Sequence, residues 1–255
     1  MIPRLFVLLF LCLEIFMPCP CFAEDPYPRE ITICYGHWKP YEYMEGKKTK
    51  GVNVEVVEAA AKRLGVRIRW KAYPWSRCMQ SARIGLVDGL MSLYRTAERE
   101  KVLYYPDENL NVDQSVFITY PGSGVTFDGS LTSLTGEEVM VARENSHGKA
   151  FDTAQNFTKI SVPSHENVIL MVSARRHQLG IGSRGFFEIF MRENHLSDRV
   201  VFIDPPYLIQ TYFAFTRKKG PGYRRLADDM GKALKALKKT GAYETIQKKY
   251  GFSPG

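Results

Sequence analysis

The sequence predicts an α/β protein with two lobes, in which the first lobe is made from two separate parts of the chain. Strand and helix patterns alternate over residues 30–93, and a Pro-Gly break at 121–124 precedes a second alternating stretch. Two extended runs, 111–120 and 209–216, bracket that second stretch. Two adjacent strands that cross between lobes would form a hinge, with a ligand cleft beside it.

The first ninety residues are expected to form a β-α-β-α-β unit with a parallel sheet. The expected elements are a strand at 30–35, a helix capped by Asn53 and stopped by Gly65, a half-buried strand at 66–72, a helix from Pro74 to Gly85 and a strand at 87–93.

The second alternating stretch contains strands at 138–143 and near Ile160 and Leu179, and helices at 147–154, 166–175 and 185–193. The segment Asp204-Pro205-Pro206 is expected to end a strand at 200–203, because proline has no N–H for the sheet. We therefore expect residues 24–118 and 210–255 to form the first lobe and residues 119–209 the second.

Residues 1–23 have the layout of a cleaved secretory signal peptide. A short basic start precedes an apolar stretch at 5–17, and Ala23 ends the segment. A membrane anchor is the alternative, but Glu14 interrupts the stretch, which is shorter than the ~20 residues of a membrane-spanning helix. The mature protein is expected to be exported.

The net charge of +8 is concentrated near the end of the chain, where residues 217–249 carry eleven Lys or Arg and three Asp or Glu. A basic segment of this kind can bind nucleic acid or anionic lipid. Leu226, Met230, Leu234 and Leu237 recur at helical spacing, however. This pattern favours a helix that packs on the core and exposes its lysines, so no nucleic-acid partner is expected.

Two cysteines follow the signal segment, Cys34 and Cys78. In an oxidising compartment they can form a disulfide, but they can equally be two buried thiols, and the sequence leaves both open. The five histidines have none of the spacings of a metal site, so neither a metal nor another cofactor is expected.

Seven segments in order resemble the bacterial extracellular solute-binding proteins of family 3, over about residues 31–251. The segments are Trp38-Lys39-Pro40-Tyr41, Gly51 to Val57, Ile84 to Gly89, Thr96 to Arg99, Leu134 to Val139, Asn145 to Gly148 and Lys239 to Gly251. The resemblance implies a periplasmic-binding-protein architecture of the Venus-flytrap type (type II). It also implies a periplasmic, monomeric protein that captures a small carboxylate-bearing solute, an amino acid or a related compound, for an inner-membrane ABC permease or a sensor.

The resemblance also implies a set of ligand-binding residues. Arg99 stands where the family places its carboxylate-binding arginine, whose planar guanidinium suits a bidentate contact. The other candidates are Trp38, Tyr41 and Trp75 as an aromatic wall, Ser92 and Tyr94 at the end of a strand, and Ser146, His147 and Ser183 from the second lobe. The loop at 145–148 is expected to present free N–H groups to an anion.

One departure from the family pattern affects the ligand. The family's amino-acid binders hold the ligand's ammonium with a second-lobe aspartate, and Ser183 stands at or beside that position. A buried ammonium without a carboxylate partner is costly. A carboxylate without an ammonium group is therefore as plausible a ligand as an amino acid, unless Glu42 or Glu188 supplies the acid.

Two alternatives remain. Gly180-x-Gly182-x-x-Gly185 matches a dinucleotide-binding pattern, but the preceding residues 175–178 form a poor buried strand. A cyclohexadienyl-dehydratase-like enzyme is the main rival, since such enzymes resemble this family. It would need a proton donor, for which His147, Glu188 and Glu42 are the candidates.

Overall fold

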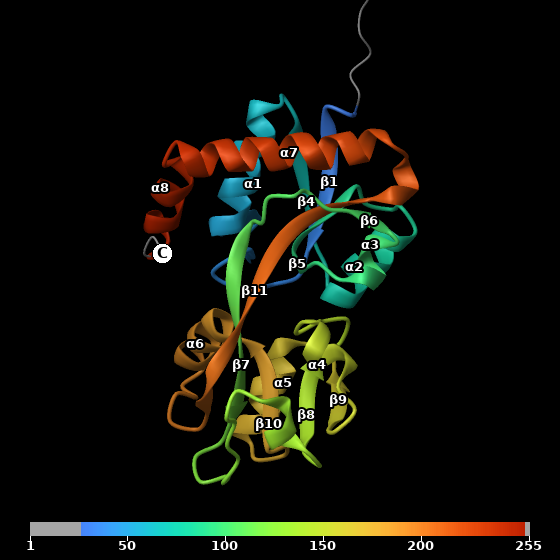
Figure 1. The fold of residues 1–255 in the computed structure, drawn as a ribbon. Coiled ribbons are helices and arrows are strands. Elements are labelled where there is room, and N and C mark those ends of the chain that lie inside the picture. Colours follow the sequence, from blue (N-terminus) through green and yellow to red (C-terminus); the bar gives the residue numbers. More distant parts are fainter. Residues whose placement is uncertain (1–26, 253–255) are drawn as a thin grey trace, which may run out of the picture.

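The computed structural model describes residues 27–252, and these form two lobes joined by two long strands (Figure 1). The segment interpreted as a signal peptide lies outside the described residues. The first lobe contains β1 (Glu30–Tyr35), β2 (Tyr43–Glu45), β3 (Lys48–Lys50), α1 (Val52–Arg63), β4 (Arg67–Ala72), α2 (Trp75–Arg83), β5 (Gly89–Tyr94), α3 (Ala97–Glu100), β6 (Leu103–Tyr104), α7 (Gly222–Lys239) and α8 (Ala242–Lys249). The second lobe contains β8 (Glu138–Ala142), α4 (Lys149–Thr153), β9 (Thr158–Val162), α5 (His165–Ser173), β10 (Leu179–Ser183) and α6 (Arg184–Glu193). The two linking strands are β7 (Asn111–Thr119) and β11 (Val201–Thr216).

A single nine-stranded sheet runs through both lobes in the order β4-β1-β5-β11-β7-β10-β8-β9, with β6 paired to β11. The linking strands are antiparallel neighbours in the middle of this order. The second-lobe strand β10 pairs with β7 from Ser115 to Ile118, and the first-lobe strand β5 pairs with β11 from Thr211 to Phe215. Each linking strand therefore belongs to both lobes. The lobe boundaries expected between residues 118 and 119 and between residues 209 and 210 fall inside these two strands.

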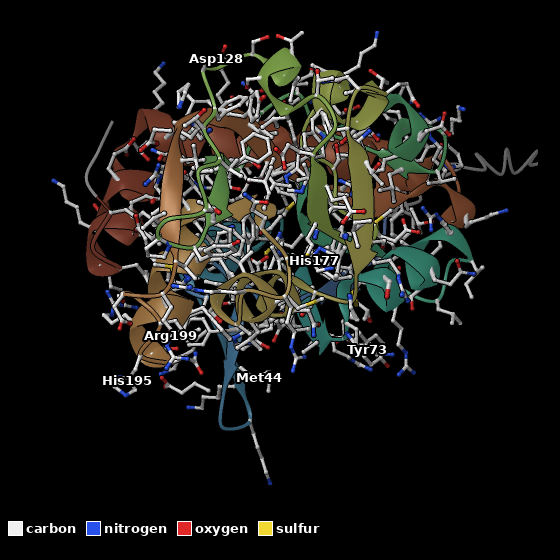
Figure 2. The ribbon with its side chains drawn as sticks, turned by 90° about the horizontal axis from the view of Figure 1, so that it is seen from below. Met44, Tyr73, Asp128, His177, His195 and Arg199 are labelled. Carbon is white, nitrogen blue, oxygen red and sulfur yellow. A yellow bond between two sulfur atoms is a disulfide. The ribbon has the colours of Figure 1, made fainter. Side chains whose placement is uncertain are left out.

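The predicted β-α-β-α-β unit is confirmed in the first lobe, where β1 pairs in parallel with β4 on one side and β5 on the other. The β2–β3 hairpin is an addition to that unit. It projects from the lobe with Met44 exposed (Figure 2). The described residues contain no helix with the length and apolar character that a membrane crossing requires.

Two layers of helix cover the first-lobe sheet. On one face α1 and α7 pack against Ile31 and Ile33 of β1. The four apolar residues of the predicted helical stripe are all buried there, and the lysines at 232, 235 and 239 are exposed, as the pattern predicted. On the other face α2 is joined to β1 by a disulfide between Cys78 and Cys34. Of the two alternatives that the sequence leaves open, the disulfide is therefore confirmed and the pair of free thiols is not.

The expected break at Asp204-Pro205-Pro206 is wrong, because β11 continues through it. The register of β11 against β7 shifts between Ile203 and Tyr207 and then resumes. The irregularity leaves the two prolines, which lack an N–H, outside the ladder of hydrogen bonds without ending the strand. The chain therefore returns from the second lobe to the first as one strand.

Candidate functional site

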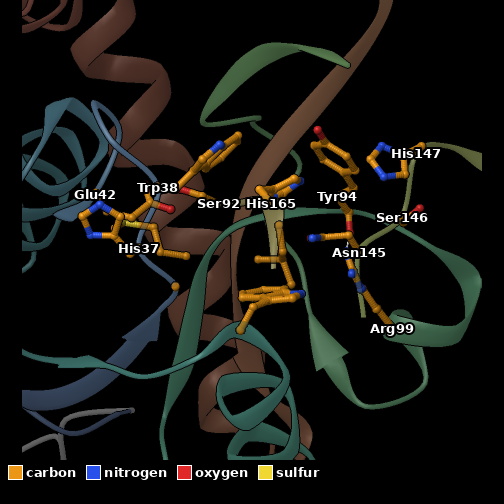
Figure 3. A pocket seen from close by; sticks show the side chains of 14 residues that line it. His37, Trp38, Glu42, Ser92, Tyr94, Arg99, Asn145, Ser146, His147 and His165 are labelled. Carbon is orange, nitrogen blue, oxygen red and sulfur yellow. Dashed lines mark hydrogen bonds between the residues drawn. The ribbon is translucent and has the colours of Figure 1, made fainter. Parts of the chain in front are cut away.

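A pocket of about 60 Å³ lies between the lobes, beside the linking strands (Figure 3). Its first-lobe lining consists of Gly36, His37, Trp38, Glu42, Trp75, Met91, Ser92, Leu93, Tyr94 and Arg99, and its second-lobe lining of Asn145, Ser146, His147 and His165. A wider cavity of about 370 Å³ shares part of this lining and extends to Tyr73, Arg143 and Glu166.

Arg99 is buried in the pocket wall, with 7% of its surface exposed. The short helix α3 holds it, and the Thr96 side chain caps this helix by accepting a hydrogen bond from the Arg99 N–H. The guanidinium donates from Nη1 to the carbonyl of Tyr94 at 2.9 Å and from Nη2 to the carbonyl of Glu144 at 2.5 Å. Burial lowers its pKa, but arginine stays charged at neutral pH. Within residues 27–252 the guanidinium makes these two hydrogen bonds, which leaves three of its five N–H groups for a ligand.

Glu42 lies on the opposite side of the pocket from Arg99 (Figure 3). A tight turn places it there, in which the Glu42 N–H donates to the carbonyl of Trp38 at 3.0 Å. Its Oε2 accepts from Ser92 Oγ at 2.8 Å and from Asn53 Nδ2 at 3.3 Å. Burial raises the pKa of this carboxyl to about 8, against the lowering effect of those two hydrogen bonds.

The prediction that Asn53 caps α1 is wrong. Gly51 occupies the cap position, and Asn53 is fully buried within the first turn. Its Nδ2 donates to Ser92 Oγ at 2.8 Å, and its Oδ1 accepts from Asn111 Nδ2 at 2.9 Å. Asn53 therefore positions Ser92, which has a left-handed φ of +57° at the pocket wall.

A second buried carboxylate, Asp113 of β7, lies next to the pocket but does not line it. Its Oδ2 accepts from Tyr94 Oη at 2.5 Å and its Oδ1 from Ser183 Oγ at 2.7 Å. Tyr94 belongs to the first lobe and Ser183 to the second, so Asp113 connects them at the linking strands. Burial raises the pKa of Asp113 above its ordinary value, although both hydrogen bonds act to lower it.

The loop before α4 differs from the expected anion site. Asp152 accepts from Ser146 Oγ and, at 2.9 Å, from the His147 N–H. The Gly148 N–H donates to Ser146 Oγ at 3.3 Å. The Ser146 hydroxyl and the N–H groups of His147 and Gly148, which were expected to be free for an anion, are therefore paired with Asp152 of α4 or within the loop.

His147 nevertheless lines the pocket and is fully buried. Its Nδ1 is hydrogen-bonded to Ser115 Oγ at 2.8 Å, whereas its Nε2 has no partner among the described residues. Burial is the main cause that lowers its pKa to about 3. Nε2 of the neutral ring can therefore form one hydrogen bond with a ligand.

Two of the three expected aromatic residues line the pocket. Trp38 Nε1 is buried and has no partner within residues 27–252. Trp75 Nε1 donates to the carbonyl of Glu144 at 3.1 Å. Tyr41 lies behind the wall, where its ring packs on Trp38 with a centroid distance of 4.5 Å and on Phe252 at 5.6 Å.

The structure thus brings seven of the sequence-predicted residues into one pocket: Trp38, Trp75, Ser92, Tyr94, Arg99, Ser146 and His147. Tyr41 and Ser183 lie outside its lining. Of the two acids considered as ammonium partners, Glu42 lines the pocket, whereas Glu188 is exposed and does not. His37, Met91 and His165 also line it, and no motif marks them in the sequence.

The glycines of the Gly180-x-Gly182-x-x-Gly185 motif serve packing. A Cβ at Gly180 would lie 2.4 Å from Val168 Cγ1, and one at Gly182 would lie 2.5 Å from Phe187 Cζ. Strand β10 therefore needs glycine for the close approach of α5 and α6, which accounts for the motif without a dinucleotide. Within the described residues, no group of three or more His, Cys, Asp or Glu could hold a metal ion.

Comparisons with known proteins agree with this architecture. Residues 31–253 match the family model of the bacterial extracellular solute-binding proteins, family 3. Two Bacillus subtilis (strain 168) proteins are similar along most of their length: the probable amino-acid-binding protein YxeM, 23% identical over 84% of this chain and 81% of that one, and the arginine-binding extracellular protein ArtP, 24% identical over 84% and 82%.

Solved structures share the fold. A histidine kinase sensor domain with similarity to periplasmic binding proteins has a TM-score of 0.75 at 20% identity, covering 89% of this chain and 98% of that one. The arginine-, lysine-, histidine-binding protein ArtJ from Geobacillus stearothermophilus has a TM-score of 0.72 at 19% identity, covering 88% and 96%.

The fold and the interlobe pocket define a two-lobed solute-binding protein. The chain belongs to the bacterial extracellular solute-binding proteins, family 3. This membership and the binding proteins among its relatives confirm the prediction of a solute-binding protein rather than an enzyme.

Proposed function

We propose that this protein, exported to the periplasm and acting as a monomer, captures a small carboxylate-bearing solute between its lobes and delivers it to an inner-membrane ABC-type transporter. The observation that carries the proposal is the burial of Arg99 in the interlobe pocket. A buried guanidinium with free N–H groups is the strongest carboxylate-binding group that a protein side chain supplies.

The binding cycle follows from the two lobes. The ligand docks on Arg99, Ser92 and Trp38 of the first lobe, and the second lobe then closes over it with His147. Closure removes water, and the lower local dielectric strengthens the contact between Arg99 and the carboxylate.

Export is supported by the family description and by the pattern of residues 1–23. Arginine and glutamine are the first ligands to test, since an ancestral arginine-binding protein of similar fold has been solved with each of them bound. A role in a sensor is the second candidate, because a histidine kinase sensor domain has the same fold.

A thermal-shift screen tests the proposal. The purified mature protein is mixed with each of the twenty L-amino acids, with succinate and with agmatine, which is arginine without its carboxylate. A ligand that binds only the folded protein raises the melting temperature by mass action. We expect at least one carboxylate to do so. Stabilisation by agmatine alone, or by no compound in the panel, would contradict the proposal.

A further inference from the structure

Two large apolar side chains are exposed in the loop that follows α2, here called the apolar loop (residues 84–86). Ile84 has 55% of its surface exposed and Leu86 has 68%. Neither belongs to a hydrophobic cluster of the described residues. A backbone hydrogen bond holds the loop, since the Leu86 N–H donates to the carbonyl of Ser81 at 2.8 Å. The fold therefore presents these two side chains outwards from an ordered loop.

Five exposed basic side chains lie next to this loop, in the segment that links β11 to the first turn of α7, here called the basic turn (residues 217–225). The basic turn contains no acidic residue, and its basic residues are Arg217, Lys218, Lys219, Arg224 and Arg225. The two segments lie side by side, because a Cβ at Gly85 would lie 3.0 Å from Lys218 Cβ. At the end of β11, Thr216 Oγ1 donates to the carbonyl of Ala82 in α2 at 2.6 Å. The apolar loop and the basic turn therefore form one continuous surface, here called the docking patch.

Acidic residues near the basic turn reduce its charge without cancelling it. Three of them form ion pairs with the turn: Asp88 with Lys219, Asp228 with Arg224, and Asp229 with Arg225. In the adjoining segment, Glu98 and Glu100 pair with Lys101 and Arg95 and so add no net charge. Three more exposed lysines continue the basic surface along α7: Lys232, Lys235 and Lys239. Eight basic residues against the three aspartates leave a net charge of 8 − 3 = +5.

An anionic membrane surface fits both halves of the docking patch. Lysine and arginine bind lipid phosphates, and apolar side chains beside them enter the boundary between headgroups and acyl chains. A nucleic acid would account for the cations but not for Ile84 and Leu86, which have no ring to stack on a base. A second copy of this chain, joined patch to patch, would bring like charges together. The combination of cations with aliphatic side chains therefore favours lipid.

We infer that the docking patch binds the surface of an anionic membrane, with Ile84 and Leu86 inserted at the headgroup boundary and the basic turn on the lipid phosphates. No residue of the patch lines the interlobe pocket or the wider cavity. Docking on a membrane and binding of a solute therefore use separate surfaces, and the inference does not depend on which solute is bound.

Sedimentation with lipid vesicles tests the inference. The purified mature protein is mixed at low salt with vesicles of phosphatidylcholine alone, or of equal parts phosphatidylcholine and phosphatidylglycerol, which is anionic. Each basic residue near an anionic surface adds to the attraction, so we expect the wild type to bind the anionic vesicles at least about tenfold more tightly than the neutral ones. High salt should weaken this binding, because it screens the cations.

A leucine variant tests the apolar half of the patch. Leu86→Ser removes an inserted side chain and should weaken binding to anionic vesicles about fivefold, since each buried CH₂ contributes to membrane affinity. The matched control is Leu208→Ser, which removes a leucine of similar exposure, 70%, from β11. The control should change binding less than about twofold, because Leu208 lies outside the patch.

A pair of charge variants tests the basic half. Lys218→Gln with Arg225→Gln removes two charges from the basic turn and should weaken binding about tenfold. Lys47→Gln with Lys48→Gln makes the same change in net charge on the exposed β2–β3 hairpin. This control should change binding less than about threefold, since only the overall charge of the protein is altered.

Hydrogen–deuterium exchange of the wild type, with and without anionic vesicles, locates the contact without any variant. The amides of residues 84–86 and 217–222 should exchange more slowly when vesicles are present, whereas those of the hairpin at 43–50 should not change.

The following results would overturn the inference: equal binding to both kinds of vesicle, no binding to either, or slower exchange outside the docking patch only. Equal binding by Leu86→Ser and Leu208→Ser, or by the two charge variants, would do the same. If a DNA duplex binds the wild type as tightly as the anionic vesicles do, the patch is a general polyanion site and its assignment to a membrane is wrong. The proposed function is unaffected by each of these results.

Discussion

Arg99 of the first lobe donates a hydrogen bond to the backbone carbonyl of Glu144 in the second lobe, at 2.5 Å. Trp75 Nε1 donates to the same carbonyl at 3.1 Å, and Arg83 pairs with the Glu144 carboxylate at 2.8 Å. One residue of the second lobe thus accepts hydrogen bonds from three first-lobe residues at the edge of the pocket. The guanidinium that is proposed to bind the ligand also joins the lobes. Its position therefore affects both ligand binding and the contact between the lobes.

The variant Arg99→Lys should weaken binding of a carboxylate ligand by about 10- to 100-fold, because an ammonium cannot form two parallel hydrogen bonds or reach both carbonyls. Calorimetry with the ligand found in the screen measures the loss. Arg95→Lys is the matched control, since Arg95 lies four residues away and pairs with Glu100 near the surface. Equal affinities for Arg99→Lys and wild type would place the carboxylate site elsewhere.

The raised pKa of Glu42 gives a prediction about stability that needs no ligand. The folded protein holds this proton up to about pH 8, whereas the unfolded chain releases it near the ordinary value of 4.5. The stability contributed by the protonated carboxyl is complete below pH 4.5 and is lost as pH rises towards 8. Glu42→Gln removes this loss.

Thermal unfolding of the ligand-free proteins at pH 5, 7 and 9 measures the effect. Glu42→Gln and wild type should melt at similar temperatures at pH 5, and the variant should melt several degrees higher at pH 9. Asp113 also has a raised pKa, but it is present in both proteins. Parallel curves for the two proteins across this pH range would show that Glu42 is not desolvated in solution.

Local patterns predicted the elements that depend on them. The spacing of Leu226, Met230, Leu234 and Leu237 marks the buried face of α7, and alternation at 66–72 marks the edge strand β4. The pairing of the linking strands β7 and β11 also followed from the chain order, since these two extended runs bracket the second lobe. These features need only periodicity and sequence order.

The roles of single polar residues could not be predicted in the same way. Asn53 has the type and position of a helix cap, but its tertiary partners Ser92 and Asn111 lie 39 and 58 residues further along the chain. Ser146 and His147 stand at a helix start, but Asp152, one turn later, takes their donors. In both cases a contact that sequence spacing does not reveal decides where the donors go.

Asp113 has no signal in the sequence, yet it connects Tyr94 and Ser183 across the lobes. The variant Tyr94→Phe removes one donor from this buried carboxylate, which should lower the free energy of unfolding by about 1–3 kcal/mol. Urea denaturation measures the change. Tyr104→Phe is the control, since the described structure gives the Tyr104 hydroxyl no hydrogen bond, and it should stay within about 0.5 kcal/mol of wild type. Similar losses in both variants would mean that the contact with Asp113 contributes nothing specific.

Gly182 tests the packing explanation of the glycine motif. A Cβ at this position of β10 would lie 2.5 Å from Phe187 Cζ and 2.8 Å from His165 Cδ2, so both rings must move. Gly182→Ala should therefore lower the free energy of unfolding by about 1–3 kcal/mol, the usual cost of overpacking a core. Because His165 also lines the pocket, its displacement should weaken ligand binding as well.

Urea denaturation and calorimetry on the same samples measure both effects of Gly182→Ala. Gly36→Ala is the control for stability, since a Cβ there would meet Trp75 Cβ at 3.5 Å, an ordinary contact. If Gly182→Ala is as stable as wild type, β10 does not need the close approach of α5 and α6. The glycine motif would then require an explanation other than packing, and binding of a dinucleotide to the wild type would be the next measurement.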